Sequence, residues 1–305
     1  EISDMLGATF GAETEKASYR TSSYGSPFST ARVRTTSIYG QLTVKPVTGL
    51  SLTGGLRHDD HDTFGGRTTF AANGLFTPNG GRTILRASFG QGFKTPTLFQ
   101  LYSDYGNTRL NPESSESWDA GLTQHLLDGR IEAGVTWFER KTRNQIIYVP
   151  CSAPLTGICA GRPSGTYDNV ARSKAQGLEF TLALRPVDAL RMQAAYSYID
   201  AQNELTGKNL PRRPKHSVNL AADYDWAFGL KTGFTVTHVG PSFDNASNSR
   251  KLDGYVLVDL RAAYPVTKNV ELFARIENLF DEQYETAYRY GTARRAGYVG
   301  VRLAL

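Results

Sequence analysis

The sequence predicts an all-β fold, an antiparallel up-and-down transmembrane β-barrel of about fourteen strands. Three observations predict it: side chains alternate between apolar and polar along many segments, turn-forming connections recur between those segments, and Gly and aromatic residues are abundant. The chain has 30 Gly, 16 Tyr and 15 Phe, a balance that favours strands over helices. It contains no run of about 18 apolar residues, which a transmembrane helix needs, so strands are the elements left to cross a membrane.

Alternation with a period of two marks each expected strand. Val256, Val258 and Leu260 fall on one face of such a segment, whereas Asp259 falls on the other. Each segment therefore keeps one apolar side. The expected strands of this kind include residues 5–20, 178–185, 218–226, 256–264, 271–277 and 293–305.

The connections between these segments alternate in length. Outer-membrane barrels have short periplasmic turns and longer extracellular loops, and turns rich in Gly, Pro, Asn and Asp fit the short ends. The expected short turns are residues 45–50, 77–82, 127–130, 185–190, 226–230 and 264–270. The connections between them are expected to be mostly longer and more polar: residues 21–31, 61–66, 94–113, about 143–170, 201–213, 241–253 and 281–292. Composition does not change along the chain, so we expect one domain over residues 1–305.

The final segment indicates which solvent surrounds the sheet. Val299, Val301, Leu303 and Leu305 share one of its faces, and we expect no protein layer over them. Lipid would solvate that face, and the strand would need a paired edge, because unpaired backbone groups in hydrocarbon cost several kcal/mol each.

The two faces of the sheet are therefore expected to meet lipid and lumen. The expected lipid-facing residues include Leu182, Leu220, Leu260 and Val301, and the expected lumen-facing residues include Arg185, Asp223, Arg261 and Arg302. Tyr and Trp near strand ends are typical of interfacial girdles, and the candidates are Trp118, Trp137, Tyr196, Tyr224 and Trp226. The alternative is aromatic packing in a soluble β core.

Several stretches resemble the barrel of TonB-dependent outer-membrane receptors, from about residue 32 to the end. They are IENLFDEQY (276–284), RRAGYVGVRLAL (294–305), FGQGFKTPTLFQLYSDYGNTRLNPESSESWDAGL (89–122) and NVARSKAQGLEFTLALRP (169–186). Within that family, GNTRLNPESSESWDAGL and NLPRRPKHSVNL resemble the vitamin B12 receptor branch most, although related wording occurs in siderophore receptors.

The resemblance implies a barrel of about twenty-two strands around an N-terminal plug that carries the TonB box. About fourteen expected strands fall some eight short of that number. We therefore expect residues 1–305 to be the C-terminal part of such a barrel, without the plug and the first strands.

The resemblance also implies a function: active uptake of a large, scarce ligand across the outer membrane of a Gram-negative cell. Cobalamin is the expected ligand, with a ferric siderophore as the alternative, and the TonB complex is the expected partner through the plug. A passive, plugless porin of fourteen strands is a further alternative that the strand count leaves open. We expect no enzyme, because the chain shows no nucleophile signature of a hydrolase.

Ligand-binding side chains are expected in the extracellular loops. A large polar ligand needs hydrogen-bond donors and stacking faces from several loops. The alternative is that the same residues pack the loops or anchor them at the interface. The candidates are Tyr102, Tyr105, Asn107 and Arg109 in one loop, and Tyr288, Arg289 and Tyr290 in another.

Two smaller features suggest a metal site and a disulfide. In the run HDDHD, alternation puts His58, Asp60 and Asp62 on one face, where they could ligate a loop-bound Ca²⁺; no other cofactor is expected. Cys151 and Cys159 are the two cysteines of the chain, and both fall in the longest expected loop. An oxidising exterior favours a disulfide between them over two free thiols.

The formal charge of +5 does not indicate a nucleic-acid partner. The 34 basic residues are interleaved with 29 acidic ones and form no recognition motif. The one dense basic run is Arg212, Arg213, Lys215 and His216. Contact with outer-membrane lipid, in particular anionic lipopolysaccharide, or simple solvation would account for it.

Overall fold

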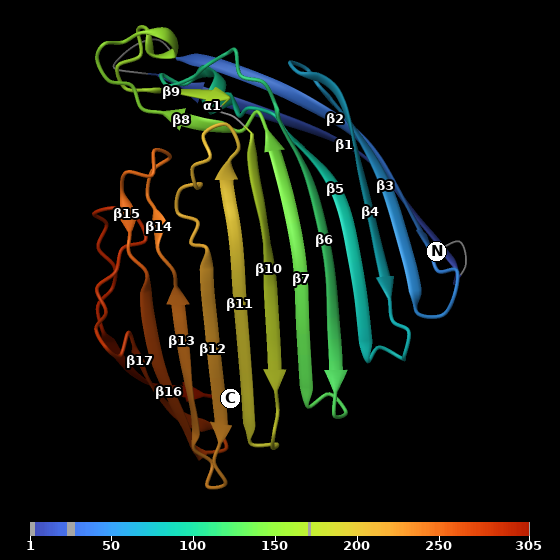
Figure 1. Ribbon diagram of the computed structural model, residues 1–305, viewed down its shortest axis with the longest axis vertical. Helices are drawn as coiled ribbons and strands as arrows, with labels where there is room; N and C mark the ends of the chain where they lie inside the picture. The colour runs from blue at the N-terminus through green and yellow to red at the C-terminus, as the bar shows by residue number, and fades with distance from the viewer. Residues whose placement is uncertain (1–3, 23–27, 170–171, 305) are drawn as a thin grey trace. The chain divides into compact units, whose positions relative to one another are not determined.

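The computed structural model describes residues 4–22, 28–169 and 172–304, and it consists almost entirely of antiparallel strands (Figure 1). Fourteen of the described strands form one sheet, in which neighbours along the chain are neighbours in space. The sheet strands are β1 (Leu6–Thr21), β2 (Ser29–Val44), β3 (Leu50–His61), β4 (Gly65–Phe76), β5 (Thr83–Lys94), β6 (Glu113–Leu126), β7 (Ile131–Arg143), β10 (Ser173–Leu184), β11 (Leu190–Asn203), β12 (His216–Asp225), β13 (Lys231–Val239), β16 (Tyr255–Thr267), β17 (Val270–Glu277) and β18 (Ala296–Leu303). The predicted all-β, up-and-down arrangement of fourteen strands is confirmed.

Short elements that the alternation did not predict lie in the longer connections. They are helix α1 (Leu98–Tyr102), the 3₁₀ turn η1 (Gly157–Cys159), and two hairpins, β8 (Ile146–Val149) with β9 (Thr166–Asn169) and β14 (Ser242–Phe243) with β15 (Lys251–Leu252). Helix α1 starts at a capping box, in which Thr97 and Gln100 exchange side-chain to backbone hydrogen bonds. Among the described helices, none is long and apolar enough to span a membrane.

The chain divides into two compact units. Unit 1 comprises residues 1–76, 86–119 and 139–174, and unit 2 comprises residues 77–85, 120–138 and 175–305. One boundary follows the end of β4 at Phe76, and the other four fall inside strands β5, β6, β7 and β10. The expectation of a single domain stays a prediction.

In unit 1, the register of β1 to β4 separates an apolar face from a polar face. Phe10 lies opposite Gly40, Gly40 opposite Leu56, and Leu56 opposite Phe70. These side chains, with Ile38 in the next row, point away from any protein cover, and Phe10 is 81% exposed. The polar face carries the residues that alternate with them, among which are Glu13, Ser37, Arg57 and Asp59.

Unit 2 shows the same separation. Leu220 lies opposite Val236, and Leu260 lies opposite Phe234 and Ile276, so apolar side chains form a continuous face. On the other face Arg261 pairs with Asp223 at 2.7 Å and Arg302 pairs with Glu271. The predicted separation of Leu220 and Leu260 from Asp223 and Arg261 is thus confirmed.

Leu101, Leu110 and Ile146 form a small buried apolar cluster in the longer connections of unit 1. Other buried apolar residues of the described structure are Ala201, Ala222 and Leu252. On β18, by contrast, Val299 is 87% exposed and Leu303 is 66% exposed. An apolar sheet face without protein cover is what a lipid-facing barrel wall presents.

Several boundaries differ from the sequence prediction. The last strand begins at Ala296 instead of residue 293, and Leu305, which we expected on its apolar face, lies outside the described residues. The connection after β3, expected over residues 61–66, consists of residues 62–64. Within it, Nδ1 of His61 accepts hydrogen bonds from the amides of Thr63 (3.1 Å) and Phe64 (3.4 Å).

Candidate functional site

The first group of loops is here called the disulfide loop cluster and consists of residues 95–112 and 146–169. Its centre is the buried set Leu101, Leu110 and Ile146, against which Phe64 and Tyr167 pack. Burial of these side chains holds two loops distant in sequence together, since each loop alone is too short to exclude water from an apolar core.

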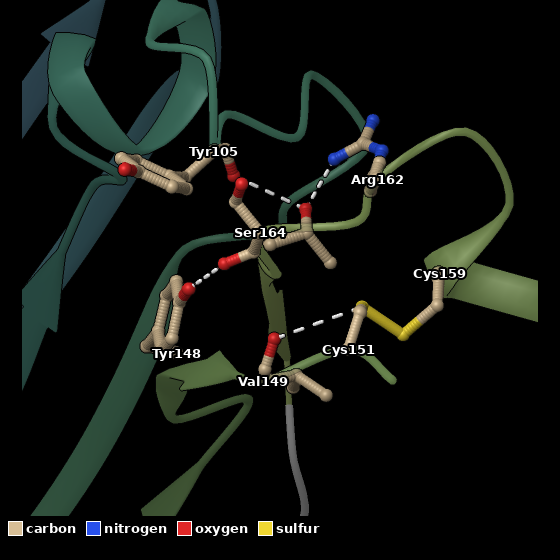
Figure 2. Close-up of a disulfide and its surroundings, with 8 residues drawn as sticks. Tyr105, Tyr148, Val149, Cys151, Cys159, Arg162 and Ser164 are labelled. Carbon is tan, nitrogen blue, oxygen red and sulfur yellow. Dashed lines mark hydrogen bonds between the residues drawn. A yellow bond between two sulfur atoms is a disulfide. The ribbon is translucent and has the colours of Figure 1, made fainter. Parts of the chain in front are cut away.

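A disulfide closes the outer part of this cluster (Figure 2). Cys151 and Cys159 are bonded, with their Cα atoms 5.5 Å apart. Next to the bridge, Arg162 donates to the carbonyl of Gly106 at 2.5 Å and to the hydroxyl of Thr166. The guanidinium therefore joins the disulfide segment to the loop that follows α1.

Aromatic side chains form the wall of the same cluster. The ring of Tyr148 makes edge contacts with Tyr105 and Tyr167, with centroids 5.9 and 5.7 Å apart. The Tyr148 hydroxyl donates to the carbonyl of Ser164 (Figure 2). Aromatic edge contacts of this kind add stabilisation beyond the area that they bury.

The four candidate residues of this loop fall into two groups. Tyr102 and Tyr105 are 42% and 37% exposed, and Arg109 is exposed as well, so these side chains are open to a ligand. Asn107 is only 4% exposed. Its amide donates to the carbonyl of Tyr167 at 2.9 Å and accepts from the backbone of Arg109 at 3.0 Å. Asn107 thus holds the loop together and does not face solvent. The sequence could not show this, because alternation and loop length do not indicate which groups the Asn107 amide bonds.

The second group of loops, called the Tyr288 loop cluster, consists of residues 203–215, 241–253 and 278–295. Asp244 joins them: it accepts from the backbone of Tyr288 at 3.2 Å and from Arg212 Nε at 2.9 Å. These bonds, that of the Tyr288 amide first, lower the pKa of the Asp244 carboxyl below its ordinary value. The carboxylate is therefore the acceptor that orders Tyr288.

The candidate residues of this cluster lie close together. The guanidinium groups of Arg250 and Arg289 each lie 5.2 Å from the centre of the Tyr288 ring. Tyr290 follows and is 73% exposed. The cluster therefore presents aromatic faces and cations to solvent side by side, the combination that stacks on flat groups and binds anionic ones.

The motif IENLFDEQY anchors the loop that carries these residues. Asn278, 6% exposed, accepts from the amide of Glu282 at 2.8 Å and donates to the Glu282 carbonyl at 2.9 Å. Asp281 accepts two hydrogen bonds from Arg294, one of them at 2.8 Å. The bond from Arg294, followed by that from the Arg295 amide, holds the pKa of the Asp281 carboxyl well below its usual range.

A cavity of about 430 Å³ lies on the polar face of unit 1. Glu13, Glu15 and Asp59 supply carboxylates, while Arg57 and Lys94 supply cations. Arg57 binds Asp59 at 2.8 Å and Glu13 at 3.3 Å, so part of this charge is already compensated. The sequence did not predict this site, because alternation only assigns each residue to a face, and the pairing of strands β1 to β5 brings these residues together.

Two of the residues predicted to hold a metal ion, His58 and Asp62, have other partners. His58 Nδ1 is bonded to the Thr68 hydroxyl at 2.9 Å, and Asp62 accepts from the Arg34 amide at 3.0 Å. In the described part of the chain, no group of three or more His, Cys, Asp or Glu side chains is arranged to hold a metal ion. The site of His58, Asp60 and Asp62 stays a prediction that this geometry does not support.

A family model decides the identity of the fold. The model described as "TonB dependent receptor-like, beta-barrel" matches residues 3–279. The chain belongs to this family. The receptor is also 32% identical over 253 residues to the vitamin B12 transporter BtuB of Photobacterium profundum, a match that covers 80% of this chain and 39% of that protein. The family is one of receptors and transporters, not of enzymes.

Solved receptors share the fold. The receptor superposes with a TM-score of 0.82 on the ferric enterobactin receptor PfeA of Pseudomonas aeruginosa in complex with enterobactin, at 23% identity over 98% of this chain and 51% of that one. For the siderophore receptor PirA of Acinetobacter baumannii the TM-score is 0.80, at 19% identity over 99% of this chain and 52% of that one. The receptor chain thus spans about half the length of these proteins.

Proposed function

We propose that this receptor acts in the outer membrane of a Gram-negative cell and takes up cobalamin with energy supplied by the TonB complex. The observation that carries the ligand is the 32% identity, over 253 residues, to a vitamin B12 transporter. The siderophore receptors that superpose on the chain are 19–23% identical, a level that supports the fold but not the ligand.

Each loop cluster by itself offers contacts of the kinds that the proposed ligand needs. Cobalamin is large and carries many amide groups and one phosphate, so it needs hydrogen-bond partners, cations and stacking faces from more than one loop. Tyr102 and Arg109 in the disulfide loop cluster, and Arg289 and Tyr290 in the Tyr288 loop cluster, are exposed side chains of these kinds.

The proposed path of the ligand follows the polar face of the strands. Carboxylates and cations of the cavity beside Arg57 and Glu13 offer both acceptors and donors to a ligand moving along that face. In the family, transport depends on a plug that the TonB complex pulls, and we propose the same partner here.

Uptake of radiolabelled cobalamin by a receptor-null strain that expresses the natural protein tests the proposal. We expect uptake that stops when TonB is deleted and that excess ferric siderophore does not reduce. Competition by the siderophore would favour the siderophore alternative. Uptake of small solutes without TonB, and no uptake of cobalamin, would favour a passive porin.

A further inference from the structure

A basic patch lies on the apolar face of β1 and β2, toward the end of the hairpin at which β1 ends (Thr21) and β2 begins (Ser29). It consists of Lys16, Arg20, Arg32 and Arg34. Lys16 lies directly opposite Arg34, and Arg32 lies opposite Ser18. Because side chains alternate along a strand, these four share the face that carries Phe10.

The charges of this patch are not compensated by the protein. Within residues 4–22, 28–169 and 172–304, none of the four side chains forms an ion pair; Arg20 lies over the Phe28 ring at 4.0 Å. Like charges directly opposite one another across two strands destabilise a sheet. On the polar face of the same unit the pattern is the reverse, since Arg57 pairs with both Glu13 and Asp59. The basic patch is therefore arranged to meet an anion from outside the chain.

The nearest acidic groups on this face belong to β3 and the turn that follows it. Asp60 lies opposite Thr36, and Asp62 accepts a hydrogen bond from the backbone amide of Arg34 at 3.0 Å. Neither carboxylate is within ion-pair distance of a patch side chain in the described structure. They border the patch on one side and leave its β1 side cationic.

Apolar rows lie beside the patch along the strands. Phe10, Leu56 and Phe70 form one such row across β1, β3 and β4. Lys16 is six residues beyond Phe10, which corresponds to about 20 Å along a strand. With a strand tilt of about 45°, the charges are displaced from the aromatic row by about 14 Å along the membrane normal. A ligand that fits has acyl chains at the level of the aromatic row and a phosphorylated head group at the level of the charges.

The dense basic run of residues 212–216 does not present unpaired cations of this kind. Arg212 is paired with Asp244 at 2.9 Å, and Lys215 is paired with Asp200 at 3.0 Å. The guanidinium of Arg213 donates to the carbonyl of Arg212 at 3.3 Å. These cations are engaged within the protein, so the anion contact that the run suggested is better placed on β1 and β2.

We propose that the basic patch binds the phosphate groups of lipopolysaccharide in the outer leaflet, while the apolar rows contact its acyl chains. The proposal rests on the outer-membrane location given under the proposed function. The charge complementarity, the unpaired cations directly opposite one another, and the apolar rows at the height of the lipid all fit this one occupant.

The test is native mass spectrometry of the natural receptor, extracted and delipidated in detergent, with purified diphosphorylated lipopolysaccharide. The patch variant K16Q/R32Q/R34Q is compared with R212Q/R213Q/K215Q, which loses the same charge. We expect the patch variant to bind about 100-fold more weakly, from the contribution of each basic residue near anionic lipid, and the control to bind like the wild type. The charge-conserving variant K16R/R32K/R34K should also bind like the wild type.

Dephosphorylated lipopolysaccharide and inorganic phosphate separate the possible sources of binding. We expect dephosphorylated lipopolysaccharide to bind weakly. We expect inorganic phosphate, at equal phosphate concentration, not to compete with the binding of lipopolysaccharide. Equal retention by the patch variant, or equal affinity for the dephosphorylated lipid, would overturn the proposal. Cobalamin uptake by the patch variant should equal that of the wild type. If the wild-type receptor itself takes up no cobalamin, this result counts against the proposed function and not against the lipid-binding patch.

Discussion

Arg261 reaches across strand β13 to bind Asp223, with Nε and Nη2 at 2.9 and 2.7 Å from Oδ1. Gly233 lies opposite both residues in the register. A Cβ at this position would lie 2.4 Å from the Asp223 oxygen and 2.7 Å from Arg261 Nε. The absence of a side chain on the middle strand is thus what permits an ion pair between its two neighbours.

We expect Gly233→Ala to lower the free energy of unfolding by about 1–3 kcal/mol, the usual cost of inserting a methyl group into filled space. Both charged side chains are 41% exposed, so the ion pair itself contributes only about 0.2–1 kcal/mol, and displacement of atoms causes most of the loss. Urea unfolding of the natural protein in liposomes measures it. The control is Gly297→Ala, where an added Cβ meets nothing within 4 Å; an equal loss there would contradict the explanation.

Arginine on the apolar face should destabilise the sheet much more than arginine on the polar face. We expect Leu220→Arg to cost about 2–4 kcal/mol at mid-membrane depth, because the charge would enter lipid. Asn219→Arg, one residue away on the polar face, should cost much less. The same liposome unfolding experiment compares the two. Equal costs would show that lipid does not contact the face of Leu220.

The link between Asp281 and Arg294 should make the loop of residues 278–295 sensitive to acid. Its lowered pKa means that Asp281 stabilises the folded loop fully above about pH 4, and that this contribution is lost as the pH falls from there through the folded-state pKa. Hydrogen exchange of the loop should therefore distinguish wild type from Asp281→Asn clearly at pH 5 and less at pH 3. A difference that grows on acidification would contradict the sign.

Removal of the disulfide should act locally. The loop closed by Cys151 and Cys159 is short, so the bridge removes little entropy from the unfolded chain. Its contribution to the free energy of unfolding is therefore less than about 3 kcal/mol. We expect the double variant Cys151→Ser/Cys159→Ser to keep its sheet, while proteolysis within residues 150–165 becomes faster. Alkylation followed by mass spectrometry checks the bridge directly. Two thiols that react without a reductant would contradict it.

Asn107 and Tyr290 should behave differently when each is replaced by Ala. Asn107→Ala leaves the Tyr167 carbonyl and the Arg109 amide without their partner, and a buried group of this kind costs about 1–3 kcal/mol. Tyr290→Ala removes a ring that is 73% exposed, so stability should hardly change while cobalamin affinity falls. Thermal unfolding and equilibrium binding separate the two effects. Unchanged affinity after Tyr290→Ala would remove this residue from the site.

Much of the wall could be predicted from the order of residues. Side chains of a strand alternate strictly, so the sequence places Leu220 and Asp223, or Val301 and Arg302, on opposite faces without knowledge of their neighbours. The turns and the alternation also predict fourteen strands that pair with their neighbours along the chain. For the loops, the sequence indicated that Cys151 and Cys159 would pair.

What the sequence by itself determined is the all-β class, the alternation of the two faces and the resemblance to the receptor family. Only the tertiary structure decided that Asn107 is buried, that Arg212 forms an ion pair with Asp244, and that Lys16 lies opposite Arg34. The physical reason is the range of the interactions. Alternation is a property of one strand, whereas a buried amide, an ion pair between loops or a cation row requires the register of segments up to 60 residues apart, as for Asn107 and Tyr167.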